Sequence, residues 1–241
     1  MAIYCITGAN RGLGLEFVRQ LAANPQNTIL ATSRLTSPEH VNDLKALSSP
    51  NLHVLQCDVS DVDSIKSFIG GAGKVLGGGK KIDFLLNNAG VNYKSEQTSL
   101  TSDPEAILQN VRINVIGPAK VVQFFLEAGL LSENARILNM TSGLASMEKS
   151  STISPRKCAP YSISKAGLNM LSVHLADDLR AKLPGSILIV MDPGWVKTRM
   201  GGNGAILEAK DSIGGMLKVL HGLKSEDNGK FFTYDGSEVP W

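Results

Sequence analysis

The sequence predicts an α/β fold in which parallel strands alternate with helices. Short apolar runs with strand character alternate along the chain with segments whose apolar residues recur at helical spacing. A glycine-rich turn at residues 7–14 joins the first of these strands to the first helix, and small, amide and hydroxyl residues follow the later strands. Strands that alternate with helices in this way are typical of a parallel sheet covered by helices on its faces.

The length of 241 residues fits either one large α/β domain or two small ones. We find no linker that would indicate two, so we expect a single domain over residues 1–241. The formal net charge is only +2, and Lys and Arg are spread along the chain. This pattern does not indicate a nucleic-acid-binding surface or a membrane tether.

The first residues lack the charged and then apolar layout of a signal peptide, and no apolar run approaches the ~20 residues that a membrane-spanning helix requires. We therefore expect a soluble, cytoplasmic protein. The three cysteines and four histidines show no metal-ligand spacing, so we predict no metal site. Cys158 lies in a polar loop just before Tyr161, and we interpret it as a spectator thiol.

The glycine-rich turn has the context of a phosphate-binding loop. An apolar strand, Ile3 to Thr7, precedes it, and helical spacing begins at Leu15. Glycines allow the backbone to approach a ligand closely, and the N-terminus of the following helix offers free N–H groups to a pyrophosphate. The residues expected to line this part of a dinucleotide site are Gly8, Asn10, Arg11, Gly12, Leu13 and Gly14.

The second strand, residues 28–32, is followed by Ser33 and Arg34. An NAD site usually has an acidic residue here for the 2′-hydroxyl of the adenosine ribose, whereas an arginine suits the 2′-phosphate of NADP. Arg34 and Arg11 together favour NADP(H), although both side chains also fit an ordinary solvated surface. Asp58 and Val59 follow the third strand and are expected near the adenine.

The remaining elements follow from the same patterns. Helices are expected at 38–47, 62–75, 104–128, 161–182 and 211–220, and strands at 52–57, 82–86, 136–140, 186–191 and 230–233. Because ligands bind at the carboxyl ends of parallel strands, further cofactor contacts are expected from residues that follow the fourth and sixth strands: Asn88, Ala89, Gly90, Pro193, Gly194, Val196 and Thr198.

Tyr161 and Lys165 are one helical turn apart and therefore lie on one face of their helix. A nearby ammonium favours the phenolate, so we expect Lys165 to lower the pKa of Tyr161 toward the range useful for proton exchange. Ser142 follows the fifth strand, where its hydroxyl is expected to donate to a substrate carbonyl oxygen. The alternative for the pair alone is a solvated helix face.

Asn114 lies in an apolar part of its helix although it is a poor helix former. Two interpretations are open: a buried amide that bonds only the main chain, or one that also holds a water for proton relay to Lys165. Two loops, about 143–160 and 195–210, are expected to shape the substrate site, and the glycine-rich segment 201–204 is a candidate lid.

Together these motifs, in this order, resemble the short-chain dehydrogenase/reductase family over nearly the whole chain. The segments 194–198 and 234–241 are similar to the sniffer and C-factor type of carbonyl reductase. The resemblance implies a single Rossmann-type doubly wound domain with about seven parallel strands and helices on both faces. It also implies a catalytic tetrad of Asn114, Ser142, Tyr161 and Lys165, with Tyr161 and Lys165 also contacting the cofactor.

The implied activity is hydride transfer between NADP(H) and a ketone or aldehyde, or a secondary alcohol in reverse. Two alternatives are an NADP(H)-binding signalling or redox-sensing protein with little catalysis, and a nucleotide-sugar epimerase or dehydratase. The tetrad argues against the first. The second requires a further substrate domain, and little chain follows Thr198 to form one. The resemblance also implies a homodimer or homotetramer.

Overall fold

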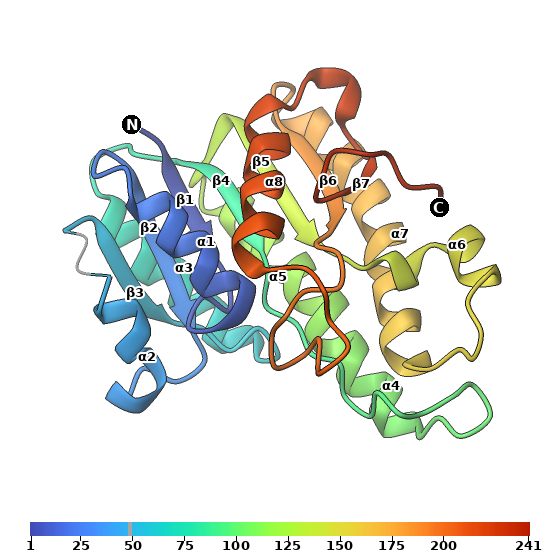
Figure 1. Ribbon diagram of the computed structural model, residues 1–241. Helices are drawn as coiled ribbons and strands as arrows, with labels where there is room; N and C mark the ends of the chain where they lie inside the picture. Colours follow the sequence, from blue (N-terminus) through green and yellow to red (C-terminus); the bar gives the residue numbers. More distant parts are fainter. Residues whose placement is uncertain (48–49) are drawn as a thin grey trace.

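The computed structural model describes residues 1–47 and 50–241, and seven parallel strands form one sheet in the order β3-β2-β1-β4-β5-β6-β7 (Figure 1). Their bounds are Ile3–Ile6 (β1), Thr28–Ser33 (β2), Leu52–Gln56 (β3), Ile82–Asn87 (β4), Leu131–Met140 (β5), Ile187–Asp192 (β6) and Phe231–Thr233 (β7). The strand order reverses between the neighbouring strands β1 and β4. One half of the sheet starts at β1 and the other half starts at β4. Open sheets of this kind bind ligands at such a switch point. The predicted α/β fold is confirmed.

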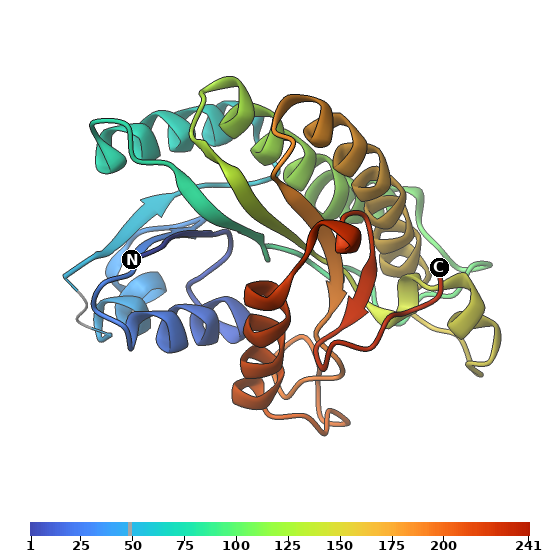
Figure 2. The same cartoon turned by 90° about the horizontal axis from the view of Figure 1, so that it is seen from above.

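Helices cover both faces of the sheet (Figure 2). The bounds of the longer ones are Gly12–Ala22 (α1), Pro38–Lys45 (α2), Val62–Leu76 (α3), Pro104–Val111 (α4), Gly117–Glu127 (α5), Ala159–Lys182 (α7) and Ala209–Gly222 (α8). Side chains of α1, α2 and α8 form one apolar core with the sheet, and those of α3, α5 and α7 form a second core on the opposite face. The central strands are therefore buried on both sides, which explains why β1 is a continuous apolar run.

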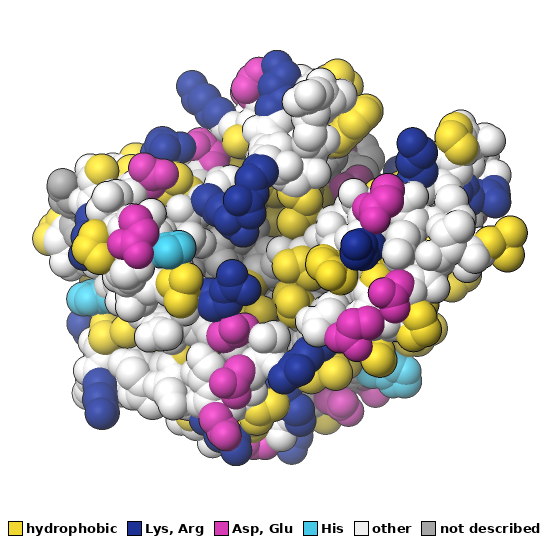
Figure 3. Space-filling view, turned by 90° about the horizontal axis from the view of Figure 1, so that it is seen from below, with side chains coloured by type: hydrophobic (Ala, Val, Ile, Leu, Met, Phe, Trp, Pro, Cys, Tyr) yellow, Lys and Arg dark blue, Asp and Glu magenta, His cyan; other side chains and the backbone are white. Residues whose placement is uncertain are grey.

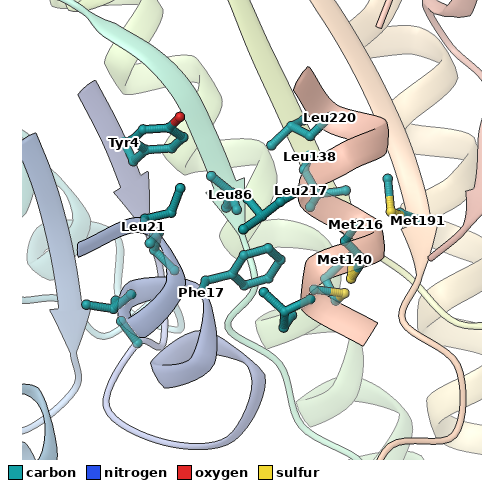
Figure 4. Close-up of a cluster of buried hydrophobic side chains, with 14 of the residues drawn as sticks. Tyr4, Phe17, Leu21, Leu86, Leu138, Met140, Met191, Met216, Leu217 and Leu220 are labelled. Carbon is teal, nitrogen blue, oxygen red and sulfur yellow. The ribbon is translucent and has the colours of Figure 1, made fainter. Parts of the chain in front are cut away.

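Figure 4 shows the first core, in which Phe17 and Leu21 of α1 face Met216, Leu217 and Leu220 of α8 over one face of the sheet. Phe17 is completely buried. Burial of one such side chain stabilises the fold by about 1.5–3 kcal/mol. This packing fixes α1, and with it the glycine-rich turn, relative to the sheet.

The expected helix over 104–128 is divided by a π-helical turn, Arg112–Ile116 (η1). The side chain of Asn114, at its centre, is bonded to neighbouring segments, and Gly117 lies so close to Val59 that a Cβ would sit 2.8 Å from the Val59 carbonyl oxygen. A π-turn inside a helix is frequent at functional sites. Here it contains Asn114, which bonds Val91 in the segment after β4.

Two other expectations differ from the structure. Strand β5 begins at Leu131, five residues before the expected start, because Leu131 pairs with Ile82 across a bulge. The loop 143–160 is not wholly irregular, since it contains a 3-10 turn, Gly143–Ala145 (η2), and a short helix, Met147–Ser151 (α6). The Ser142 and Ser146 side chains accept N–H bonds at the starts of these two elements.

Helix α7 is fixed to the sheet by buried polar bonds. Asn139 of β5 accepts a bond from Asn87 of β4 and donates one to Ser172 of α7, both at 2.8 Å. Thr141 donates to Asn169 of α7 at 2.6 Å. Buried polar groups are costly when unpaired, so these bonds select one position of α7 along the sheet.

Candidate active site

The predicted site residues gather at the carboxyl edge of the sheet, the lower edge in Figure 1. Figure 3 shows this face from below, with a central hollow bordered by apolar side chains and by Lys and Arg. The turns after β1, β4, β5 and β6 all end here. The structure thus brings together the glycine-rich turn, the amides after β4 and the Tyr161 helix.

The glycine-rich turn is closely packed. Gly8 has a positive φ of 64°, and a Cβ on Gly14 would lie 2.2 Å from the Gly8 carbonyl oxygen. Asn88 donates to the carbonyl oxygens of Thr7 and Gly8, at 2.9 and 3.0 Å, and so bonds the turn after β4 to the turn after β1. No side chain caps the N-terminus of α1. Its free N–H groups therefore suit an anion.

At the end of β2, Ser33 is buried and donates to the Leu35 carbonyl oxygen, whereas Arg34 is exposed. Asp58, after β3, is expected at the adenine, but one of its oxygens accepts bonds from the N–H and the hydroxyl of Ser60. Asp58 therefore also shapes the turn before α3. The expectation that Asp58 contacts adenine remains a prediction.

Three members of the predicted tetrad meet directly. Tyr161 and Lys165 lie on one face of α7, with the Lys165 Nζ 5.7 Å from the centroid of the Tyr161 ring. Ser142, at the end of β5, lies close enough to Tyr161 for its hydroxyl to lower the pKa of the phenol. Lys165 is 3% exposed and donates to the Met140 carbonyl oxygen at 2.6 Å. The alternative interpretation, in which this pair lies on a solvated helix face, is therefore wrong for Lys165, because its side chain is buried.

Asn114 is fully buried behind this group. Its oxygen accepts from the Val91 N–H, and its amide nitrogen donates to the Val91 carbonyl oxygen and to the Ser164 hydroxyl, each at 2.9 Å. The amide therefore bonds a side chain as well as the main chain. The water relay from Asn114 to Lys165 remains a prediction.

The expectation that Lys165 lowers the pKa of Tyr161 is wrong for this arrangement. Burial raises the pKa of Tyr161, the Asp192 carboxylate raises it further, and the Ser142 hydroxyl lowers it in part. Burial also lowers the pKa of Lys165 to about 7. Loss of solvation is the largest cause of both shifts, and Lys165 is not among the groups that shift the pKa of Tyr161. With a raised pKa, Tyr161 keeps its proton at neutral pH.

Two further residues belong to the site although the sequence gave them no role. Asp192, at the end of β6, accepts N–H bonds from Gly194 and from Gly143, and so joins the turns after β5 and β6. Cys158 precedes α7 with a positive φ of 60° and accepts a bond from Asn92 at 3.5 Å. The sequence pattern that could have indicated Asp192 is an acidic residue at the carboxyl end of a strand.

The loop after β6 is closed on itself. Val196 pairs with Leu207, and the indole N–H of Trp195 donates to the Gly201 carbonyl oxygen at 2.8 Å. The loop reaches the glycine-rich turn, because a Cβ on Gly12 would lie 3.8 Å from the Thr198 methyl group. The segment 201–204, the candidate lid, is part of this loop, and its role as a lid remains a prediction. We refer to the whole loop, residues 195–207, as the lid. Trp195 is 58% exposed.

Across residues 1–47 and 50–241, no helix is both long and apolar enough to cross a membrane, and no three His, Cys, Asp or Glu side chains are grouped so as to hold a metal ion.

The strand order, the glycine-rich turn at the switch point and the Ser-Tyr-Lys group define a Rossmann-type nucleotide-binding oxidoreductase. The model of the short chain dehydrogenase family matches residues 2–205, and the chain belongs to this family.

Relatives of known sequence and structure agree with this assignment. An uncharacterized oxidoreductase of Schizosaccharomyces pombe is 30% identical, over 99% of this chain and 98% of its own. The C-signal protein of Myxococcus xanthus is 37% identical over 66% of this chain and 93% of its own. The NADPH-bound carbonyl reductase from chicken fatty liver has a TM-score of 0.90 and 32% identity, and the carbonyl reductase Sniffer of D. melanogaster a TM-score of 0.88 and 28% identity. Each comparison covers this whole chain and at least 99% of the other.

Proposed function

We propose that the chain, as one domain over residues 1–241, is an NADPH-dependent carbonyl reductase that interconverts ketones or aldehydes and secondary alcohols. The observation that carries the proposal is that Ser142 and Tyr161 lie together at the carboxyl edge, with buried Lys165 beside them. The likeness to two carbonyl reductases, one of them NADPH-bound, supports it.

The residues at the switch point fit a dinucleotide. Gly8 and Gly14 let the turn pack closely against Ala89 and Asn88, where a Cβ would clash, and the uncapped N-terminus of α1 suits the pyrophosphate. Arg34 suits a 2′-phosphate, which an acidic residue at this position would repel. Bound in this place, NADP(H) supplies or accepts the hydride. Lys165 would hold the nicotinamide ribose, and Thr198 the carboxamide.

Tyr161 would donate its proton to the substrate carbonyl oxygen while Ser142 donates a hydrogen bond to the same oxygen. Two donors placed in advance stabilise the negative charge that develops on this oxygen. The raised pKa of Tyr161 keeps the donor protonated at neutral pH. Lys165, with Asn114 behind it, would return a proton to Tyr161.

We also propose a homodimer or homotetramer and a cytoplasmic location. Helices α4 and α7 expose apolar side chains, among them Leu108, Ile163 and Met170, which support an interface. Light scattering on the purified protein tests this part, since a monomer at micromolar concentration would contradict it.

The activity is tested by NADPH absorbance loss with a panel of aldehydes and ketones. We expect Tyr161→Phe to lower turnover by at least a hundredfold with little change in NADPH affinity, because only the proton donor is removed. The matched control is Tyr93→Phe, at an exposed tyrosine, which should leave turnover unchanged. NADPH binding without turnover of any substrate would instead favour the signalling alternative. The likeness to C-signal supports that alternative.

A further inference from the structure

Three arginines from separate segments converge beside the glycine-rich turn. Arg11 immediately precedes α1, Arg34 follows β2, and Arg199 belongs to the lid. Three causes lower the pKa of Arg11: first its burial, then the charge of Arg199, and then the charge of Arg34. Arg11 therefore lies near both of the other arginines. The contact between Thr198 and the position of a Cβ on Gly12 independently places the lid against this turn.

This convergence lacks a protein counter-charge. Within the part of the chain that the structure describes, none of the three arginines forms an ion pair, whereas Lys197 of the same lid is paired with Glu208. Neighbouring like charges repel one another, and the free N–H groups of α1 add partial positive charge at the same place. A multiply charged anion would relieve this repulsion.

The anion closest to Arg199 is identified by its neighbours. Thr198 lies against Gly12, the first residue of α1, where a pyrophosphate is expected, whereas Arg34 lies at the end of the adjacent strand, where a ribose is expected. Arg11 lies near both arginines, since the charges of both lower its pKa. Arg199 is thus placed for the diphosphate rather than for the 2′-phosphate.

We propose that Arg199 is a lid residue that binds the cofactor diphosphate and thereby holds the lid closed over the glycine-rich turn. The inference rests on the proposed dinucleotide function but assigns a contact that NAD and NADP share. Because Val196–Leu207 pairing and the Trp195–Gly201 bond close the lid on itself, fixing Arg199 fixes the loop that carries Trp195.

The test uses ADP-ribose and 2′-phospho-ADP-ribose, which contain the diphosphate but no nicotinamide. Calorimetric titration of Arg199→Gln should show both ligands weakened by the same factor, about tenfold, as expected for loss of one charge-assisted bond. Arg34→Gln should weaken only the 2′-phosphorylated ligand. Lys197→Gln, in the same lid but at the residue paired with Glu208, should leave both affinities unchanged.

Limited trypsin digestion gives a second readout. Saturating ADP-ribose should protect the bond after Lys197 in the wild type and fail to protect it in Arg199→Gln. Unchanged ADP-ribose affinity in Arg199→Gln, a loss confined to the 2′-phosphorylated ligand, or an equal loss in Lys197→Gln would overturn the assignment of Arg199.

Other results of the same titrations would contradict the proposed function. Wild-type protein that bound neither ligand would remove the dinucleotide function, and the assignment of Arg199 with it. If Arg34→Gln left the ratio of the two affinities unchanged while Arg199→Gln weakened both, only the NADP preference would be lost, and the lid contact would be supported.

Discussion

Asn114 and Val91 exchange two hydrogen bonds of 2.9 Å, one from the Val91 N–H and one from the Asn114 amide. Four residues earlier, Asn110 forms the corresponding pair with Tyr93, at 3.3 and 3.0 Å. Two amides on one face of the helix therefore hold the segment that follows β4. Only Asn114 also bonds Ser164, the residue before Lys165.

This difference predicts different effects of the same substitution. Asn114→Asp and Asn110→Asp each remove two buried N–H donors, and each should lower the free energy of unfolding by about 2 kcal/mol or more. Only Asn114→Asp should also lower turnover, at least tenfold, because it disturbs the Lys165 turn of α7. Urea unfolding and steady-state kinetics measure the two effects. Equal losses of turnover in both variants would contradict a specific role for Asn114.

A second prediction concerns Asp192, whose carboxylate raises the pKa of Tyr161. Asp192→Asn removes this charge, so the pKa of Tyr161 should fall, and the phenol should ionise at lower pH than in the wild type. Ultraviolet difference absorbance of the phenolate follows this titration, with Tyr161→Phe identifying the signal. Asp177→Asn, at an exposed acid on α7, is the control. An unchanged or higher pKa in Asp192→Asn would refute the charge effect.

A third prediction concerns the pH dependence of stability. Burial lowers the pKa of Lys165 to about 7. Between about pH 7 and about pH 10, the unfolded chain binds more protons at this amine than the folded chain, because an unperturbed lysine titrates near 10.4. The contribution of Lys165 to the free energy of unfolding therefore rises with pH over this window.

Lys165→Met should remove that contribution. Urea unfolding at about pH 7 and about pH 9 should show a larger gain in stability for the wild type than for the variant. Lys182→Met, at the exposed end of α7, should behave like the wild type. Identical gains in all three proteins would show that burial does not depress the Lys165 pKa.

A fourth prediction compares two glycines within helices. In Gly14→Ala the new methyl group would lie 2.2 Å from the Gly8 carbonyl oxygen and 2.6 Å from the Asn88 amide nitrogen. The glycine-rich turn must shift, so nucleotide binding should fall at least tenfold. At Gly70, on the exposed side of α3, nothing lies within 4 Å of such a methyl group.

Gly70→Ala should raise the free energy of unfolding by about 0.5–1 kcal/mol, as alanine favours a helix over glycine. Calorimetric titration with NADPH and thermal unfolding distinguish the two outcomes. Normal nucleotide affinity in Gly14→Ala would remove the glycine-rich turn from the proposed cofactor site.

The elements that the sequence predicted well are those determined by local pattern. Strand β1 and helix α1 follow from an apolar run, glycines and helical spacing, and the i,i+4 spacing was sufficient to place Tyr161 and Lys165 on one face. The element bounds that differed from the prediction depend on residues distant in the sequence. Strand β5 extends to Leu131 only because Ile82 pairs with it, and its polar residues give no strand signal.

The site residues that sequence reasoning missed are also set by tertiary contacts. The effect of Asp192 on Tyr161 requires that β6 and α7 meet, and the convergence of Arg199 with Arg11 requires the fold of the lid. The direction of the Tyr161 pKa was mistaken for a related reason. Spacing along a helix reveals a neighbouring charge but does not reveal how much water the packed protein excludes from both groups.

The polar bonds between α7 and the sheet affect how the protein can be altered. The α7 partners of Thr141 and Asn139, which are Asn169 and Ser172, lie about one and two turns beyond Lys165, and these bonds fix the position of the helix along the sheet. The position of Tyr161 on α7 is therefore set by groups that lie away from the proposed substrate site. Directed evolution toward new substrates should accordingly tolerate many changes in the loop 143–160, while variants at these four polar side chains should be lost from a library.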